Sequence, residues 1–509
     1  MIALAACISN ESIKPPVSPG SDIFSHQVTC LSLDVMRFFS SLVASASVIV
    51  GLVSAAPAST ITHDKRSIVE RAGVVYNVFE HAATGAKIEF VNNSGICETT
   101  PGVKQYSGYL SVGDNMNMWF WFFEARQNPT TAPLAAWFNG GPGCSSMIGL
   151  FQENGPCKFK VGSGNTTPIN NTNSFNNYAN MIYIDQPIGV GFSYGTDSVT
   201  STVTAAPYVW KLIQAFYSSF PEYTSRDFGI FTESYGGHYG PEFAKYILDQ
   251  NKAQAGTKIN IVALGINNGW FDATIQEQAY VQFSYNNTYK PLITSSQYTK
   301  YMNAFTNTCS PALKKCTTSG SNADCTKADT ACYNAVEGPL SSTGDFDVYD
   351  IRAPSNDPEP PENYVAYLQS AAVVKAIGAK STYQECPDAP YNKFASTGDN
   401  PRSFVSALGE VVSAGITTLI WAGDADWICN WFGGLAVANV ISYSGTSAFA
   451  AKSLAPYTVK GKEGGTFKTQ GNLSFLRVYG AGHEVMYYQP ELSLQAFIQT
   501  MKKGAIAST

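Results

Sequence analysis

The fold of this chain is decided by the stretch Phe231-Thr-Glu-Ser-Tyr-Gly-Gly237. Residues 226–232 are short and mostly apolar and predict a buried strand, while residues 239–248 carry apolar side chains at helical spacing. A strand that turns into a helix so abruptly exposes the residue at the turn, here Ser234, above the edge of a sheet. Gly236 suits this turn because a side chain there would strike the neighbouring strand. The first glycine of the G-x-S-x-G pattern is missing, so an ordinary serine at a strand-helix turn remains an alternative.

Short apolar strands and helices alternate on both sides of this turn. Further strands are expected at 134–138, 181–184, 259–266, 417–421 and 475–479, and helices near 203–219 and 361–377. Residues 72–133 mix aromatic alternation with polar turns and predict antiparallel strands at one side of the sheet. This order predicts an α/β protein with a central, mostly parallel mixed sheet flanked by helices.

One segment, residues 273–355, breaks the alternation. It holds four closely spaced cysteines and Gly/Ser/Thr-rich stretches, and it contains no clean strand. We interpret it as a helical, disulfide-tied cap inserted over the carboxyl edge of the sheet. The core then comprises residues 67–272 and 356–509.

The N-terminus carries processing signals. An apolar run that follows Arg37 and ends in small residues predicts a signal peptide at 36–58, and hence secretion to the cell exterior, with the vacuole less favoured. Residues 1–35 precede a better start codon and are interpreted as a gene-model extension. The dibasic pair Lys65-Arg66 suggests a propeptide at 59–66, or else an ordinary solvated charge pair.

Composition limits the partners. The 509 residues carry a net charge of −6, only 14% are charged, and no basic run is present, so nucleic acid is an unfavourable partner. No apolar segment closes the chain as a membrane anchor. We expect no cofactor and no metal, and the oligomeric state stays open. Glycosylation sequons occur at Asn92, Asn165, Asn170, Asn286 and Asn472.

Candidate partners for Ser234 follow other strands. A serine hydroxyl becomes a nucleophile when a base accepts its proton and a carboxylate orients that base. His483 follows the strand at 475–479, whereas His238 lies one turn into the helix after Ser234 and is expected to point away. Asp424 and Asp426 follow another strand, where an aspartate can also simply form a turn. The order Ser, Asp, His along the chain is that of α/β-hydrolases.

Five stretches together resemble the signatures of the serine carboxypeptidases. They are Trp137-Phe-Asn-Gly-Gly-Pro-Gly-Cys-Ser-Ser146, Asp185-Gln-Pro-Ile-Gly-Val-Gly-Phe-Ser193, Glu233-Ser-Tyr-Gly-Gly-His-Tyr239, Gly423-Asp-Ala-Asp-Trp-Ile-Cys-Asn430 and Gly482-His483. The chain resembles the secreted fungal members of that family. The resemblance implies the α/β-hydrolase fold with an inserted cap, and removal of single residues from peptide C-termini.

The resemblance also implies roles for individual residues. It makes Ser234 the nucleophile, His483 the base and Asp426 the orienting acid. It assigns the oxyanion hole to the backbone amides of Gly141 and Tyr235. The set that would bind the substrate carboxylate is Trp137, Asn139, Glu153 and Glu233.

The two glutamates of this set agree with the expected chemistry. An exopeptidase binds a terminal carboxylate, yet the motifs contain no Lys or Arg. Two neighbouring glutamates cannot both ionise easily, so one pKa should rise and a protonated Glu153 or Glu233 can donate to the substrate. Such a site works best in acid. The alternative for Glu233 is an exposed loop carboxylate without this role.

The disulfide pairing of the cysteines is suggested by the family resemblance and not by the sequence alone. Nine cysteines follow residue 35, so at least one thiol is free, and the sequence alone permits many connectivities. The family pattern implies Cys309–Cys332 enclosing Cys316–Cys325 and implies Cys144–Cys386, which leaves Cys97 with Cys157. Cys429 is then free, beside the pocket for the leaving residue.

Glu484 departs from those relatives that have methionine after the catalytic histidine. An ionised carboxylate at the mouth of the leaving-residue pocket should favour Lys or Arg there, although a solvated glutamate without influence is the alternative. The function expected is thus a secreted acid serine carboxypeptidase that acts through an acyl-enzyme on peptide and protein C-termini. An esterase or acyltransferase on the same fold is the alternative, and it would not need Asn139, Glu153 or Glu233. A catalytically dead binding protein is disfavoured by the intact Ser, Asp and His.

Overall fold

The computed structural model describes residues 64–82, 85–160, 162 and 167–509. The expected extension at 1–35, the signal peptide at 36–58, most of the possible propeptide and the sequon at Asn165 lie outside these residues. Within the described part, no helix combines the length and the apolar character needed to cross a membrane.

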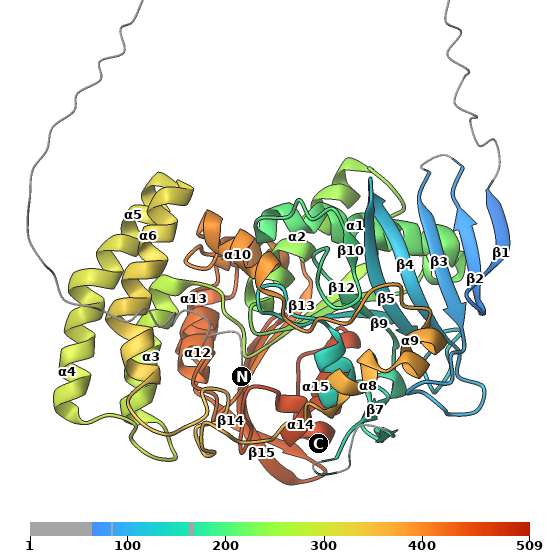
Figure 1. Cartoon of the computed structure of the whole chain (residues 1–509). Helices are drawn as coiled ribbons and strands as arrows, with labels where there is room; N and C mark the ends of the chain where they lie inside the picture. Colours follow the sequence, from blue (N-terminus) through green and yellow to red (C-terminus); the bar gives the residue numbers. More distant parts are fainter. Residues whose placement is uncertain (1–63, 83–84, 161, 163–166) are drawn as a thin grey trace, which may run out of the picture. The chain divides into compact units, whose positions relative to one another are not determined.

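One sheet of 14 strands carries the fold (Figure 1). In spatial order its strands are β1 (Lys65–Arg71), β2 (Val74–Glu80), β3 (Lys87–Asn92), β4 (Gln105–Gly113), β5 (Met116–Phe123), β9 (Asn180–Asp185), β6 (Leu134–Phe138), β11 (Phe228–Glu233), β12 (Ile261–Asn267), β13 (Thr417–Gly423), β16 (Leu473–Val478), β15 (Lys462–Gln470) and β14 (Ala455–Val459), and β10 (Tyr194–Gly195) also pairs with β5. The middle, from β9 to β16, is parallel, and the strands outside it pair antiparallel. A separate pair joins β7 (Cys157–Lys158) to β8 (Ile169–Asn170). The expected mixed sheet is therefore confirmed, and its parallel strands lie together at the centre.

Alternate side chains of the central strands enter two separate cores, because side chains along a strand point to opposite faces. Phe120 and Phe138 enter one core, and their neighbours Trp121 and Trp137 enter the other. The first face is covered by α1 (Thr202–Ser219), α2 (Gly236–Ala253), α11 (Val405–Ser413) and α12 (Trp431–Val440). The second is covered by α8 (Asn363–Gln369), α9 (Ala371–Ile377) and α15 (Pro490–Met501). Helices on both faces bury the strands completely, which explains their continuous apolar sequences.

The helix expected over 361–377 is instead two helices, α8 and α9. They are separated at Ser370, whose backbone is extended (φ −69°, ψ 137°). The Ser370 hydroxyl donates to the carbonyl of Tyr367 at 2.7 Å, a local bond that competes with helix continuation. Several further elements lack a strong pattern in the sequence. These are β1, β14 and β15 at the sheet edges, α10 (Asp388–Thr397), α13 (Thr446–Ala451) and α14 (Val485–Tyr488).

The segment 273–355 contains helices and no strand. It holds α3 (Ala273–Asn286), α4 (Ser295–Ala304), η4 (Phe305–Cys309), α5 (Ser310–Ser319), α6 (Asn322–Cys332), η5 (Tyr333–Glu337) and α7 (Gly338–Ser341). Helices α3 to α6 stand together at one end of the sheet in Figure 1. Disulfides Cys309–Cys332 and Cys316–Cys325 close the hairpin of α5 and α6.

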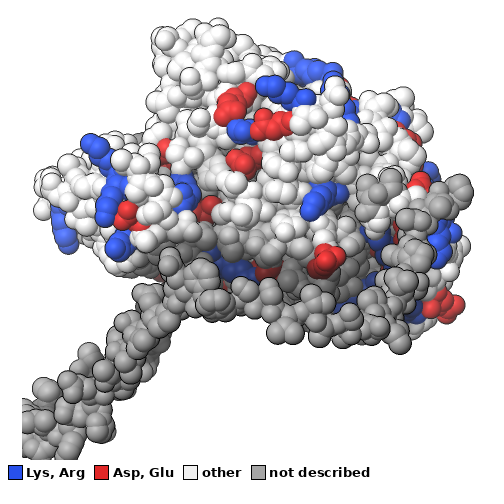
Figure 2. Space-filling view, turned by 90° about the horizontal axis from the view of Figure 1, so that it is seen from above, with Lys and Arg blue, Asp and Glu red and all other residues white. Residues whose placement is uncertain are grey.

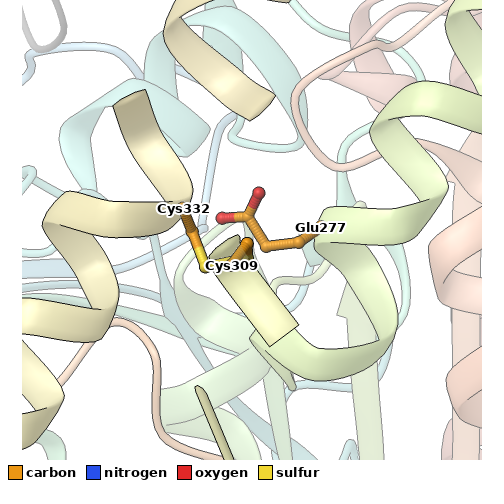
Figure 3. Close-up of side chains that lie close together, drawn as sticks. All are labelled: Glu277, Cys309 and Cys332. Carbon is orange, nitrogen blue, oxygen red and sulfur yellow. A yellow bond between two sulfur atoms is a disulfide. The ribbon is translucent and has the colours of Figure 1, made fainter. Parts of the chain in front are cut away.

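A carboxylate lies against one of these disulfides. An oxygen of Glu277 and the two sulfurs of Cys309 and Cys332 lie within 4.8 Å of one another (Figure 3). The sulfurs are bonded to each other, so they are not thiolate ligands, and this group is not a metal site.

The other disulfides join Cys97 to Cys157 and Cys144 to Cys386, and Cys429 is a buried free thiol. These are the pairs that the family resemblance implied. On the face seen in Figure 2, basic and acidic side chains of the described residues are interspersed and most of the surface is uncharged.

Candidate active site

Ser234 occupies the turn between β11 and α2. Its φ of +62° is unusual for a residue with a side chain, so the backbone is strained there. Amides of Gly237 and Trp270 both donate to the Ser234 carbonyl at 2.9 Å and hold the turn. The strand, the strained serine and the helix form a sharp elbow of the kind that can present a nucleophile, with Ser234 half-buried at its tip.

The expected reason for Gly236 was wrong in one detail. A Cβ atom at Gly236 would lie 2.4 Å from the Cβ of Thr232, so the clash is with the strand that enters the turn and not with its neighbour. The Thr232 hydroxyl donates to the Gly236 carbonyl at 2.9 Å, so the residue that replaces the first glycine of the pattern braces the turn.

His483 and Asp426 meet beside this elbow. The Nδ1 atom of His483 lies 2.9 Å from Oδ2 of Asp426. Asp426 is fully buried and also accepts from the amides of Ile428 (3.0 Å) and Cys429 (3.1 Å). With Nδ1 engaged, Nε2 is the ring nitrogen left to accept a proton.

Charges around His483 set its proton affinity. Burial lowers the pKa of His483, but the carboxylate of Asp426, helped by Glu233 and Glu484, outweighs burial and raises it to about 10. Protonating Glu233 and Glu484 removes part of this effect. Protons on the glutamates therefore favour the neutral imidazole that a base requires.

Two other residues that the sequence placed near the triad have structural positions. Asp424 accepts from Arg477 Nη2 and from the amide of Gly480, both at 3.0 Å. His238 is buried, with Nδ1 2.6 Å from the carbonyl of Trp270, so it is engaged away from the Ser234 hydroxyl as expected.

Two backbone amides next to Ser234 are free to donate. Within the described residues, the amides of Gly141 and Tyr235 have no hydrogen-bond acceptor. A Cβ atom at Gly140 would lie 2.4 Å from the Tyr235 amide nitrogen, so the glycine-rich loop and the elbow are in direct contact. Free amides near a reactive serine can stabilise a developing oxyanion.

A buried aspartate anchors the glycine-rich loop. Asp185 Oδ1 accepts from the hydroxyl of Ser145 (2.6 Å) and from the amide of Ser146 (3.0 Å), and its Oδ2 accepts from the amide of Phe192 (3.0 Å). The Cys144–Cys386 disulfide holds the same loop. The loop is therefore rigid before substrate arrives.

Asn139, Glu153 and Glu233 form one buried polar cluster. The Nδ2 atom of Asn139 donates to Oε1 of Glu233 at 3.1 Å and to Oε1 of Glu153 at 3.3 Å. Trp137 Nε1 donates to Asn139 Oδ1 at 2.7 Å, which fixes which end of the amide faces the glutamates. The structure thus brings together all four residues of the expected carboxylate-binding set.

Both glutamates are almost completely buried, with 2% of Glu153 and 3% of Glu233 exposed. Glu233 is therefore not an exposed loop carboxylate. Burial, opposed by hydrogen bonds and assisted by the nearby Glu484, raises the pKa of Glu153 to about 8. Burial and then Glu153 hold the pKa of Glu233 well above its usual range. No Lys or Arg of the described chain pairs with either group.

Glu484 and Cys429 border the same site. The Oε2 atom of Glu484 is shielded from solvent and has no hydrogen-bond partner, and burial raises the pKa of this carboxyl to about 8. Burial, Asp426 and Glu233 raise the pKa of the Cys429 thiol, whereas interaction with the Ser234 side chain lowers it. Cys429 is thus an un-ionised thiol beside Ser234.

Two asparagines of the site were missed in the sequence. Asn267 donates from Nδ2 to Glu233 Oε2 and to the His483 carbonyl, both at 2.8 Å. Asn268 donates to Asp426 Oδ2 at 2.6 Å. Both stand where β12 ends, and polar residues at the carboxyl ends of parallel strands are a usable signal.

The chain is similar in sequence to known serine carboxypeptidases. The sequence pattern of the Peptidase_S10 family, described as serine carboxypeptidase, matches residues 95–503. Carboxypeptidase S1 of Penicillium janthinellum is 69% identical over 425 residues, covering 82% of this chain and 100% of that protein. Carboxypeptidase S1 homolog A of Arthroderma otae is 36% identical over 522 residues, covering 86% of this chain and 79% of that protein.

A solved structure shares the fold. Kex1(delta)p, a prohormone-processing carboxypeptidase from Saccharomyces cerevisiae, aligns with a TM-score of 0.69 at 23% sequence identity. The alignment covers 80% of this chain and 92% of that one.

Proposed function

Because this chain belongs to the serine carboxypeptidase family, and is an exopeptidase, we propose that Ser234 is its nucleophile, His483 its general base and Asp426 the carboxylate that orients the base. The Asp426–His483 contact of 2.9 Å and the strained elbow at Ser234 support these roles. Glu484 and Cys429 then border the pocket for the residue that leaves.

The proposed reaction proceeds through an acyl-enzyme. His483 accepts the Ser234 proton as the hydroxyl oxygen attacks the last peptide carbonyl, and the amides of Gly141 and Tyr235 donate to the resulting oxyanion. His483 then protonates the leaving nitrogen, and the C–N bond breaks to release one free amino acid. His483 next accepts a proton from water as the water oxygen attacks the ester carbonyl. The bond between the acyl carbon and Ser234 Oγ then breaks, His483 returns the proton to Oγ, and the shortened peptide leaves with a new C-terminal carboxyl group.

Selection for chain ends rests on the cluster of Asn139, Glu153 and Glu233, the observation that carries the proposal. A buried carboxyl without a cationic partner is costly when ionised, so it holds a proton. That proton can be donated to the carboxylate of the substrate, as the amide of Asn139 can. An interior peptide bond presents no carboxylate there, so the cluster favours exopeptidase activity at acid pH.

Glu484 supports a preference for a basic leaving residue. Its unpartnered Oε2 lies next to the catalytic histidine, and a Lys or Arg side chain would supply the missing partner. Such a cation would also lower the raised pKa of Glu484 and stabilise its charged form.

We also propose that the protein is secreted and glycosylated, with a core of 67–272 and 356–509 and a cap of 273–355. Exposed Asn92, Asn170 and Asn286 are suitable acceptors. Asn472 is a poor acceptor because its Nδ2 donates to the carbonyls of Val412 (2.9 Å) and Ile416 (2.6 Å), which uses both amide hydrogens. Cleavage after the Lys65-Arg66 pair would remove Arg66, which donates to the carbonyl of Ser219 at 3.0 Å.

The assignment is tested by comparing the unsubstituted protein with Ser234→Ala. The variant should stay folded and lose at least about 10⁴-fold in release of C-terminal residues from blocked peptides at acid pH. A fluorophosphonate should label Ser234. Turnover of folded Ser234→Ala at the normal rate, or a label on another serine, would contradict it. Hydrolysis of esters without any peptidase activity would favour the esterase or acyltransferase alternative.

A further inference from the structure

A second buried aspartate, Asp399, contacts the other side of the oxyanion hole. Asp399 is 0% exposed and lies just beyond α10. Its Oδ2 accepts a hydrogen bond of 2.9 Å from the phenol of Tyr235, and bonds from the hydroxyl (2.7 Å) and amide (3.0 Å) of Thr202, the first residue of α1. The mechanism above makes no use of this carboxylate.

The contact between Asp399 and Tyr235 is important because the backbone and the side chain of Tyr235 face different surroundings. Its backbone amide is free beside Ser234, while its side chain is 3% exposed and packs against His238 and Phe394, with ring centroids 4.4 and 6.2 Å away. The phenol bond to Asp399 is the ring's one polar contact within the described residues. The peptide between Ser234 and Tyr235 is held at its carbonyl by the amides of Gly237 and Trp270, and the phenol bond anchors the Tyr235 side chain on the other side of the strained serine.

Asp399 is itself held from several directions. Gly398 precedes it with φ +60°, and a Cβ atom there would lie 2.5 Å from the amide nitrogen of Thr326 in the cap. The Asp399 carboxylate therefore joins the start of α1 to Tyr235, and the preceding Gly398 packs against the cap. This arrangement parallels Asp185, which anchors the loop that carries Gly141.

We propose that Asp399 is a positioning residue for the oxyanion hole, which acts by holding the Tyr235 side chain so that the Tyr235 amide points at the reacting carbonyl. The proposal rests on the proposed function, in which that amide stabilises the oxyanion. Asp399 touches neither the substrate nor the reacting atoms. Its effect should therefore appear in the transition state and not in substrate binding.

The first test is Tyr235→Phe, which removes the phenol bond and keeps the amide. We expect kcat to fall about tenfold with KM unchanged, because small misplacements of catalytic groups have effects of this order or larger. Affinity for a peptide aldehyde, whose hemiacetal oxygen occupies the oxyanion hole, should fall by the same factor. Active sites are counted by fluorophosphonate titration, so loss of folded protein does not imitate the effect.

Tyr217→Phe is the matched control. Its phenol is buried in α1 without any hydrogen-bond partner in the described structure, so kcat, KM and aldehyde affinity should not change. Asp399→Ala should reproduce the Tyr235→Phe loss, and the double variant should lose no more than either single variant.

Unchanged kcat and aldehyde affinity in Tyr235→Phe would overturn the proposal, as would a loss confined to KM or additive losses in the double variant. If Asp399→Ala does not fold, the kcat and aldehyde affinity of Tyr235→Phe, compared with those of Tyr217→Phe, still test the proposal. Failure of the unsubstituted protein to be labelled at Ser234 would instead overturn the proposed function, and this proposal with it.

Discussion

Two groups of buried carboxyls in this protein differ in whether a cationic side chain lies beside them. Glu98 pairs with Arg126, whose Nε atom lies 2.8 Å from the Glu98 carboxylate, and only 1% and 10% of the two side chains are exposed. Glu153 and Glu233 are almost as buried, but the side chains that donate to them are the neutral amides of Asn139 and Asn267. Glu98 has a cationic partner, whereas Glu153 and Glu233 have none among the described residues.

The proton affinities follow this difference. Burial raises the pKa of Glu98, but hydrogen bonds from Thr100 and Asn176 and the charge of Arg126 outweigh burial, so the pKa is lowered. For Glu153 burial prevails, and the pKa is raised to about 8. The carboxyl that pairs with Arg126 is thus kept charged, and the carboxyls that we propose bind the substrate are kept protonated.

Removing the cation from the first group should have the largest effect on stability. Arg126→Met leaves Glu98 buried without its partner and frees the carbonyls of Pro156 and Asn171, so the free energy of unfolding should fall by about 5 kcal/mol. Urea unfolding at pH 5 measures this change in the free energy of unfolding. The control is Lys503→Met, which breaks the exposed pair with Asp227 and should cost at most about 1 kcal/mol. Equal losses in the two variants would remove the basis of the comparison.

The second group should make stability depend on pH in a definite direction. The pKa of Glu153 and of Glu233 is higher in the folded than in the unfolded protein, so folding binds protons. The contribution of these two groups to stability is then greatest below pH about 4 and is lost as pH rises toward 8. Between pH 5 and pH 8 we expect the fall to be roughly 3 kcal/mol larger than in the Glu153→Gln, Glu233→Gln double variant. Urea unfolding midpoints at both pH values measure this difference. Identical pH dependence of the midpoint in the two proteins would show that burial does not raise the pKa values of these glutamates.

The smallest effect is expected at Glu484, a buried carboxyl whose proposed partner is a basic side chain of the substrate. Glu484→Gln should reduce the preference for Lys over Leu as leaving residue about tenfold, because it removes one ion pair of roughly 1.4 kcal/mol. The ratio of kcat/KM for two peptides that differ only in the last residue measures it. An unchanged ratio would show that Glu484 does not select the leaving residue.

Much of this arrangement could be predicted from the sequence because buried parallel strands leave unmistakable apolar runs. Leu134–Phe138 and Thr417–Gly423 form strands where those runs occur, and the expected site residues follow such strands. The edge strands β14 and β15 are only partly buried, so their sequences lack that signal. The break at Ser370 depends on one side-chain bond that no periodicity reveals.

The site was predictable where it followed motifs and not where it depended on contacts between distant segments. Asn267 joins Glu233 to His483 through two hydrogen bonds, and Asp399 reaches Tyr235 across 164 positions. Residue types and spacing cannot show which of many asparagines or aspartates makes such a contact. Burial of Glu153 and Glu233 likewise emerges only from packing.

The central claim is that Glu153 and Glu233 bind the substrate carboxylate by holding a proton. It is tested by measuring KM between pH 5 and pH 8 for a free-acid peptide and for its C-terminal amide. KM for the acid should climb by at least about tenfold as the site gains negative charge, KM for the amide should change far less, and the Glu153→Gln, Glu233→Gln double variant should flatten the rise. If KM for the acid and KM for the amide vary identically with pH in the unsubstituted enzyme, the glutamates do not bind the substrate carboxylate and the central claim is wrong.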